Sequence, residues 1–260
     1  MPKESSRITL HVPPIPPVAN HAAGAGESNQ DLSSTEMGAY VVRPESPGPH
    51  PAMMVLQEAL GVNAQIRGVA DRYAELGFVA IAPDLFHRVR PGYETSEFRL
   101  DELMALVRTL TTEGLIADAT AAFDWLSQQP DVQRAKIAAV GYCMGGRATY
   151  LANSALPLAA AISYYGGSIA PALLDRATQL HGPHLFFWGG RDTGIPPEQR
   201  RAVADAVRSA EKQFVDVEFS DATHAFFNEQ ADRYNPRAAA QSWALGISFL
   251  EDALGVTVPH

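Results

Sequence analysis

The sequence is poor in cysteine: its 260 residues contain only one, Cys143. A single cysteine cannot form a disulfide within the chain, which excludes a small fold held together by disulfides. We therefore expect a reducing compartment, and the cytoplasm is the simplest assignment. The position of that one thiol becomes the first question about function.

Long hydrophobic runs and an excess of positive charge are also absent. No stretch of about 18 or more uncharged apolar residues occurs, so we expect no membrane-spanning helix. The first residues, MPKESSRITLHV, lack the apolar segment of a secretory signal. The chain has 20 Lys and Arg against 29 Asp and Glu, a formal net charge of −9. Such a chain is not expected to bind nucleic acid or an anionic membrane.

Apolar residues make up 46% of the sequence and charged residues 19%. This balance predicts a globular protein with a sizeable core, which we interpret as a single domain over residues 1–260. Residues 13–37 differ from the rest because they are rich in Pro, Gly, Ala and Ser and bury little. They predict an irregular insertion, either a mobile edge loop or a lid.

From residue 51 onward, short apolar runs alternate with amphipathic stretches. We expect buried strands in the apolar runs, at residues 52–57, 78–84, 136–143, 159–165, 184–190 and 214–220. We expect helices at residues 63–76, 97–129 (as two helices), 145–154, 197–212 and 236–253. Two shorter strands, at 8–12 and 38–44, precede them. Alternating strands and helices predict an α/β fold, with a mostly parallel sheet covered by helices on both faces.

The single cysteine lies in the segment KIAAVGYCMGGRATYLA, at the predicted junction of a strand and a helix. Gly141 and Gly145 flank Cys143 in the pattern Gly-x-Cys-x-Gly, which is typical of a nucleophile elbow. The N-terminus of the following helix offers free N–H groups and partial positive charge, which stabilise a thiolate and an oxyanion. A free cysteine is more often a small buried hydrophobe, but this context favours a nucleophile.

A nucleophile of this kind needs a base and an acid later in the chain. His224 follows one predicted strand and Asp192 follows the strand before it, so both would project from the carboxyl edge of the sheet. Asp221 is a competing acid, but it lies on the same loop as the histidine. Triad acids come from a separate strand end, which favours Asp192. The remaining histidines show no metal-binding spacing, and we assign no metal.

Five separated segments carry a resemblance to a known family. VLQEALGVN, APDLFHR, VGYCMGG, GGRD and THAFFNE resemble, in order and spacing, the dienelactone hydrolase family. The resemblance covers nearly all of residues 38–254. It implies an α/β-hydrolase fold without a cap domain, and a cysteine hydrolase of lactones or small carboxylic esters. It implies no metal and no organic cofactor.

The resemblance also implies roles for individual residues. Cys143, His224 and Asp192 match the nucleophile, base and acid. Glu58 matches a glutamate that contacts the resting nucleophile and modulates it. The backbone N–H groups of Met144 and Ala59 match the oxyanion hole.

The residues matched to substrate binding include a departure from the family. Arg88 matches an arginine that binds a substrate carboxylate. Members that cleave dienelactone have a second arginine four residues after the catalytic histidine, where this chain has Asn228. An amide carries no charge and cannot replace the guanidinium fork. This departure weakens the expectation of a carboxylated substrate.

The expected function is therefore hydrolysis of a small ester or lactone through a Cys-His-Asp triad and a thioester acyl-enzyme. Two alternatives remain at this point: a general carboxylesterase or acyltransferase on the same scaffold, or a non-catalytic ligand-binding protein, because fold does not determine substrate. The only expected partner is the small-molecule substrate. A monomer and a small homo-oligomer are both compatible with the sequence.

Overall fold

The computed structural model describes residues 3–15 and 33–259, and one eight-stranded sheet runs through them. The strand order across the sheet is β1-β2-β4-β3-β5-β6-β7-β8. The strands are Lys3–Val12 (β1), Thr35–Pro44 (β2), His50–Leu56 (β3), Val79–Pro83 (β4), Val132–Tyr142 (β5), Ala160–Tyr164 (β6), His184–Gly189 (β7) and Phe214–Phe219 (β8). The α/β prediction is confirmed.

The sheet is antiparallel at one side and parallel over the rest. β1 pairs with β2 and β2 with β4 in antiparallel fashion, whereas β4, β3, β5, β6, β7 and β8 are all parallel neighbours. All six parallel strands therefore end at the same edge of the sheet. Loops that follow those ends can bring residues from distant parts of the sequence together.

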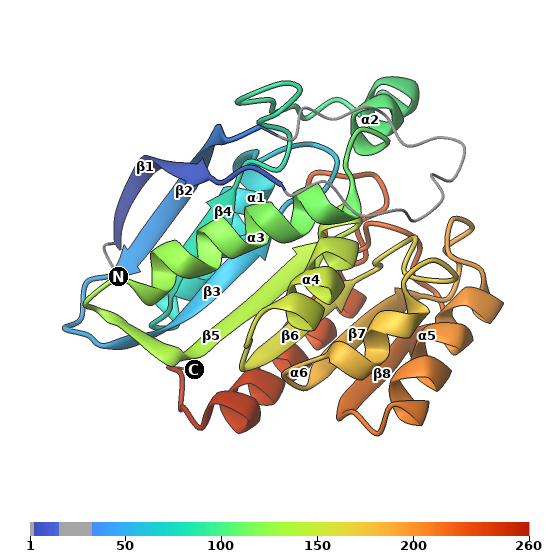
Figure 1. Ribbon diagram of the computed structural model, residues 1–260. Helices are drawn as coiled ribbons and strands as arrows, with labels where there is room; N and C mark the ends of the chain where they lie inside the picture. Colours follow the sequence, from blue (N-terminus) through green and yellow to red (C-terminus); the bar gives the residue numbers. More distant parts are fainter. Residues whose placement is uncertain (1–2, 16–32, 260) are drawn as a thin grey trace.

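Helices cover both faces of the sheet (Figure 1). The helices are Ala64–Glu75 (α1), Leu100–Val107 (α2), Thr112–Ser127 (α3), Met144–Ala155 (α4), Pro197–Ser209 (α5) and Pro236–Leu254 (α6). α3 and α4 pack against each other on one face. α1 and α6 share the other face, where the rings of Tyr73 and Trp243 lie 5.0 Å apart between centroids. In the described part of the chain, no helix combines the length and apolarity that a membrane crossing requires.

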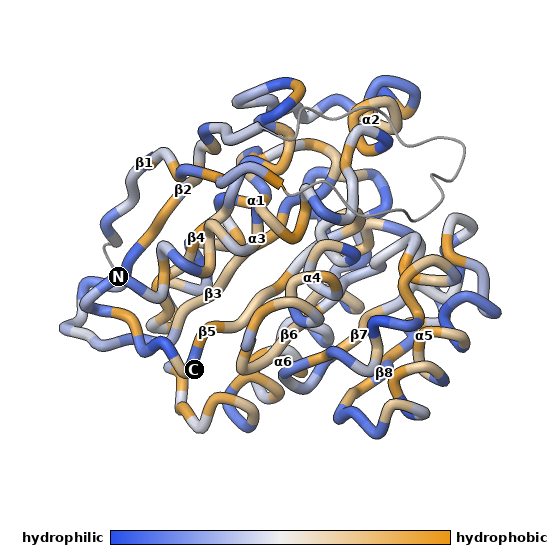
Figure 2. The backbone as a smooth tube through the Cα atoms, in the orientation of Figure 1, coloured by the Kyte–Doolittle hydropathy of each residue, from blue (hydrophilic) through white to orange (hydrophobic). Residues whose placement is uncertain are grey.

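The core follows the central strands, where hydrophobic residues predominate (Figure 2). Every residue of β4, β6 and β7 is buried. β8 differs from the expectation of a buried strand, because its residues are exposed or only partly buried. It forms an edge of the sheet, so it has a neighbour on one side only. Its alternating sequence, FVDVEF, fits that position.

Element boundaries agree with the sequence pattern at the capped helices and differ elsewhere. α1 begins after Asn63, whose side chain accepts a hydrogen bond from the N–H of Ile66, as expected for an N-cap. β2 begins at Thr35, three residues before the predicted strand. A 3₁₀ helix at Leu174–Gln179 was not predicted. Most of the predicted insertion, residues 16–32, lies outside the described residues.

Candidate active site

Cys143 lies at the turn between β5 and α4, where it is the N-cap residue of the helix. Its backbone has φ 55° and ψ −118°, a conformation that is rare for a residue with a side chain. The turn is held at both ends, because the Cys143 N–H donates to the carbonyl of Tyr164 and its own carbonyl accepts from the N–H of Gly146. A strained conformation at this position is a hallmark of functional sites.

The two flanking glycines allow this turn to pack. A Cβ on Gly141 would lie 2.0 Å from the carbonyl oxygen of Gly145, and a Cβ on Gly145 would lie 2.2 Å from that of Leu56. Both distances are far below van der Waals contact, and the clashing atoms belong to backbone that cannot move easily. The Gly-x-Cys-x-Gly pattern is therefore a packing requirement of the strand-to-helix turn.

His224 and Asp192 form a direct pair at the carboxyl edge of the sheet. Asp192 follows β7 and His224 follows β8. The ring Nδ1 of His224 donates to Asp192 Oδ2 at 2.7 Å, while Asp192 Oδ1 accepts from the N–H of Gly194 at 2.8 Å. Asp192 is buried, whereas a quarter (26%) of the His224 side chain is exposed. The side chain of His224 also hydrogen-bonds that of Cys143, and Nε2 is the ring nitrogen not used by Asp192.

Asp192 and His224 each stabilise the charged form of the other. Burial lowers the pKa of His224, but the charge on Cys143 and the hydrogen bond to Asp192 raise it more, to about 10. Burial raises the pKa of Asp192, and the hydrogen bond and charge of His224 outweigh that effect, so the pKa of this carboxyl is lowered. At neutral pH the pair is therefore an imidazolium beside a carboxylate.

Asp221 lies away from this pair. Its carboxylate is exposed and accepts from Arg237 at 2.6 Å and from Asn235 at 3.4 Å. The hydrogen bond from Arg237 lowers the pKa of Asp221. The structure thus brings Asp192, and not Asp221, within hydrogen-bonding distance of His224.

Glu58 and Asn228 form a second buried pair beside the thiol. Glu58 follows β3 and accepts a hydrogen bond from Nδ2 of Asn228. Both residues are almost fully buried. Burial raises the pKa of Glu58 to about 7, although the charge of His224 and the hydrogen bond from Asn228 act in the opposite direction. The Asn228 amide is engaged by a residue of the protein itself, which the sequence did not indicate.

The two residues whose backbone N–H groups are expected to form an oxyanion hole lie near Cys143. Met144 is the first residue of α4, and the first N–H groups of a helix have no acceptor within the helix. Met144 and Ala59 both line a cavity that also contains Cys143 and His224. The N-terminus of α4 adds partial positive charge at the same point.

Arg88 does not lie at this site, which corrects the expectation that it binds a substrate carboxylate. Its side chain is only 3% exposed, and Nη1 donates to Asp118 Oδ1 at 2.6 Å. His87 Nε2 lies 3.0 Å from the same oxygen. Arg88 lines neither cavity at Cys143. The sequence placed it near the sheet edge but could not reveal the buried carboxylate that binds it.

Two adjoining cavities open at Cys143 and His224. The larger one, of about 400 Å³, extends beneath α2, and the smaller one, of about 310 Å³, extends past Glu58 and Asn228. Phe98 and Arg233 line both, and the guanidinium carbon of Arg233 lies 5.0 Å from the centre of the Phe98 ring. Sequence reasoning missed both residues because neither belongs to a motif.

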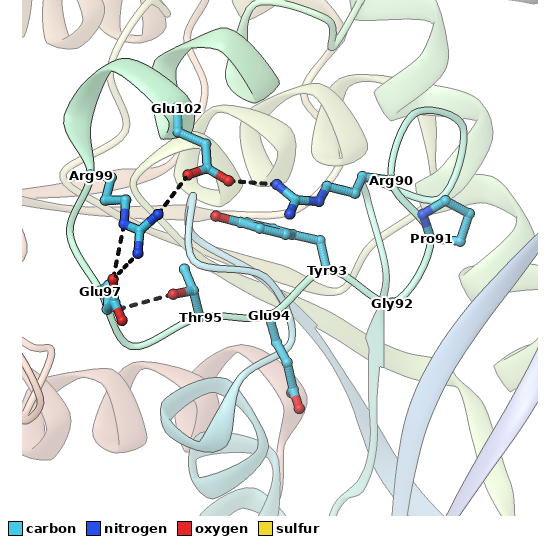
Figure 3. Close-up of a pocket in the computed structure, with 9 residues that line it drawn as sticks. All are labelled: Arg90, Pro91, Gly92, Tyr93, Glu94, Thr95, Glu97, Arg99 and Glu102. Carbon is cyan, nitrogen blue, oxygen red and sulfur yellow. Dashed lines mark hydrogen bonds and ion pairs between the residues drawn. The ribbon is translucent and has the colours of Figure 1, made fainter.

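A third cavity, on the loop before α2, has a different character (Figure 3). Its charged side chains are held in ion pairs: Arg99 pairs with Glu97, Glu102 with Arg90, and Glu94 with Arg67 outside the cavity. Its lining includes neither a cysteine nor a histidine. Among residues 3–15 and 33–259, no three His, Cys, Asp or Glu side chains are grouped as a metal site would require.

Known sequences similar to this chain point to one family. The model of the "Dienelactone hydrolase family" matches residues 37–254. A Salmonella typhimurium protein described as "putative carboxymethylenebutenolidase" is 32% identical over 244 residues, covering 88% of this chain and 89% of that protein. An Escherichia coli K12 protein with the same description is 33% identical over 229 residues, covering 84% and 83%.

Solved structures are similar in fold over almost the whole chain. A crystal structure described as a "putative dienelactone hydrolase" from Klebsiella pneumoniae has a TM-score of 0.76 and 27% identity, covering 94% of this chain and 98% of that one. A dienelactone hydrolase-like promiscuous phosphotriesterase from metagenomic libraries, at 24% identity and a TM-score of 0.77, shares the fold. The family match, these similarities and the strand-to-helix turn at Cys143 together show that the chain belongs to the dienelactone hydrolase family, with the α/β-hydrolase fold.

Proposed function

We propose that the protein hydrolyses small carboxylic esters or lactones, with Cys143 as nucleophile, His224 as acid and base, and Asp192 as the residue that orients His224. One observation carries the proposal. The hydrogen-bonded pair of Asp192 and His224 opens into the same cavity as the strained Cys143 at the N-terminus of α4. The family and the names of the relatives support the ester or lactone class.

In the first half of the reaction, the Cys143 thiolate attacks the carbonyl carbon of the substrate. The carbonyl oxygen becomes an oxyanion, which accepts hydrogen bonds from the N–H groups of Met144 and Ala59. The tetrahedral intermediate then collapses, and the bond to the alcohol oxygen breaks. Nε2–H of His224 protonates the departing oxygen, leaving a thioester on Cys143 and a neutral imidazole.

In the second half, water replaces the alcohol. Nε2 of His224 takes a proton from the water as its oxygen attacks the thioester carbonyl, and a second oxyanion forms in the same place. Collapse of this intermediate breaks the C–S bond, releases the carboxylic acid and restores the thiolate. Asp192 holds the ring through Nδ1 in both halves, so that Nε2 always faces the substrate.

Glu58 modulates the nucleophile in this proposal. Its pKa of about 7 makes it part neutral and part ionised under ordinary conditions. The ionised form places a carboxylate in the cavity that also contains Cys143, where its charge repels an anionic reaction intermediate. Asn228 holds the carboxyl group in place by donating a hydrogen bond to it.

The test compares wild type with Cys143→Ala on a panel of short esters and lactones. We expect the variant to lose at least about 10⁴-fold in kcat, as in other enzymes that lose a triad nucleophile. Wild type quenched in acid during turnover should also carry an acyl group on the peptide that contains Cys143, detectable by mass spectrometry. Equal activity of the variant, or an acyl group elsewhere, would refute the proposal.

A further inference from the structure

α2 presents an apolar face to the larger cavity, while Leu106 joins the core and Val107 packs against it. Leu100, Leu103, Met104 and Val107 all line that cavity, and their spacing (i, i+3, i+4, i+7) places them on one side of the helix. Two of them are substantially exposed, Leu100 at 55% and Met104 at 36%. Leu103 is buried, so the part of this face that needs another explanation is the exposed part that borders the cavity, Leu100 and Met104.

Half of the exposed large hydrophobic side chains lie at the cavity. Among the described residues there are six, and three of them, Phe98, Leu100 and Met104, line it. Isolated exposed hydrophobic residues are normal on protein surfaces, whereas a contiguous group marks a binding surface. Leu110 and Leu115 continue the apolar wall toward α3, and Ile195 faces it from the loop after β7.

The outer side of α2 is held by charges. Glu102 pairs with Arg90 and lies 3.9 Å from Arg99, and Arg99 pairs with Glu97 (Figure 3). These ion pairs connect the first turn of α2 to the preceding loop. They lie outside the cavity that the α2 face formed by Leu100, Leu103, Met104 and Val107 lines.

The cavity also contains the reacting groups of the proposed mechanism. Cys143, Met144, Asp192 and His224 line one part of it, and the α2 face lines another. A substrate whose ester group reaches Cys143 therefore has its adjoining group against α2. Pockets of about 300–1,000 Å³ accommodate organic ligands that are mostly buried, and this one has about 400 Å³.

From this arrangement, and resting on the proposed function, we propose that the preferred substrates are esters with an extended apolar group, a medium-length alkyl chain or an aryl ring, which binds against the α2 face formed by Leu100, Leu103, Met104 and Val107. Burying that group removes water from both surfaces. Each added methylene should therefore raise kcat/KM roughly fourfold until the cavity is full.

The experiment measures kcat/KM by pH-stat for two ester series. In the first, methyl esters run from acetate through butanoate and hexanoate to octanoate, so that only the acyl chain grows. In the second, methyl, butyl and hexyl acetates vary only the alcohol. We expect a steep rise in one of the series, which also identifies the side of the ester that contacts α2. Flat profiles in both would overturn the proposal.

Variants connect the rise to the helix. Leu100→Asn with Met104→Asn should reduce the gain per methylene from roughly fourfold to about twofold, because the wall becomes polar. Both positions are exposed, so folding should persist, and the melting temperature checks this. Leu245→Asn is the matched control, since Leu245 is an exposed leucine on α6 that lines neither cavity at Cys143. It should leave the chain-length profile unchanged. An unchanged profile in the α2 double variant would contradict the proposal.

A binding measurement separates this inference from the proposed function. Calorimetry with Cys143→Ala and a series of 2-alkanones from C5 to C9 tests the cavity without turnover. We expect affinity to rise with chain length and to weaken in the α2 double variant. Ester turnover with no dependence on chain length would leave the hydrolase proposal intact and refute the apolar substrate class. Ketone affinity that rises with chain length, without any ester turnover, would support the apolar binding site and refute the hydrolase proposal.

Discussion

Within the part of the chain that the structure describes, two buried aspartates each contact a histidine, and their surroundings are very different. Asp192 accepts a hydrogen bond from His224 at 2.7 Å, and Asp118 lies 3.0 Å from His87. The His224 side chain is 26% exposed and opens into a cavity, whereas the His87 side chain is 1% exposed. Arg88 completes the inner cluster.

The difference teaches that an Asp–His contact alone does not make a catalytic site. The outer pair has Cys143, the proposed nucleophile, beside it, opens into a cavity and lies near the N-terminus of α4. In the inner cluster, the buried guanidinium of Arg88 neutralises the carboxylate of Asp118. We propose that the outer pair moves protons, whereas the inner cluster links α3, which contains Asp118, to the loop that contains His87.

The largest expected effect comes from breaking the outer pair. Asp192→Asn should lower kcat by about 10³–10⁴-fold, because the histidine loses the partner that fixes its tautomer. The melting temperature should change little by comparison. Steady-state kinetics on any ester that wild type hydrolyses measures this effect. Asp221→Asn is the matched control and should retain nearly full activity. A larger loss from Asp221→Asn than from Asp192→Asn would exchange the two assignments.

Breaking the inner cluster should lower the free energy of unfolding and leave kcat nearly unchanged. Asp118→Asn leaves the buried guanidinium of Arg88 without its counter-charge, which costs about 3–5 kcal/mol of unfolding free energy. The kcat of the remaining folded protein should stay within a few-fold of wild type. Urea denaturation and active-site titration measure the two quantities separately. Normal stability with a large loss of kcat would show that the inner cluster takes part in catalysis.

A third carboxyl group, Glu58, sharpens the comparison because its hydrogen bond comes from an amide, that of Asn228, and not from a histidine. The folded protein holds its proton more tightly than the unfolded chain does, since its pKa rises from 4.5 to about 7. Wild-type stability should therefore fall as pH rises through that window, and the contribution of Glu58 should be fully lost above it. The Gln side chain of Glu58→Gln does not titrate, so the variant does not lose stability in this way. The unfolding free energy of the variant minus that of wild type should therefore rise by about 2–3 kcal/mol from pH 4 to pH 8. Urea denaturation at both pH values checks this, and a pH-independent difference would contradict the raised pKa.

The smallest effect concerns substrate charge. Since Arg88 belongs to the inner cluster, Arg233 is the arginine that borders both cavities. Arg233→Gln should reduce kcat/KM for a carboxylated ester relative to a neutral one by about two- to fivefold, less at high salt, because the guanidinium is exposed. Arg237→Gln, an exposed arginine that pairs with Asp221, is the matched control and should not change this ratio. Equal ratios in all three proteins would exclude Arg233 as a determinant of charge preference.

Much of the fold could be predicted because local signals and burial agree. The apolar runs at β3 to β7, and the amphipathic stretches at residues 63–76 and 236–253 that form α1 and α6, are visible in the sequence. The 3₁₀ helix and the exposed character of β8 could not be predicted, since both depend on neighbouring elements. The prediction of one domain over residues 1–260 stays a prediction, because residues 16–32 lie outside the described part of the chain.

The sequence by itself determined the strand-to-helix turn at Cys143, because only glycine fits at Gly141 and Gly145, and it indicated the strand ends that bear Asp192 and His224. The roles proposed for these residues stay predictions until kinetics test them. Tertiary structure alone decided the partners. It placed Arg88 against Asp118, Asn228 against Glu58, and the apolar face of α2 over the cavity. Motifs record local backbone requirements, whereas a contact between residues far apart in sequence depends on how the elements pack.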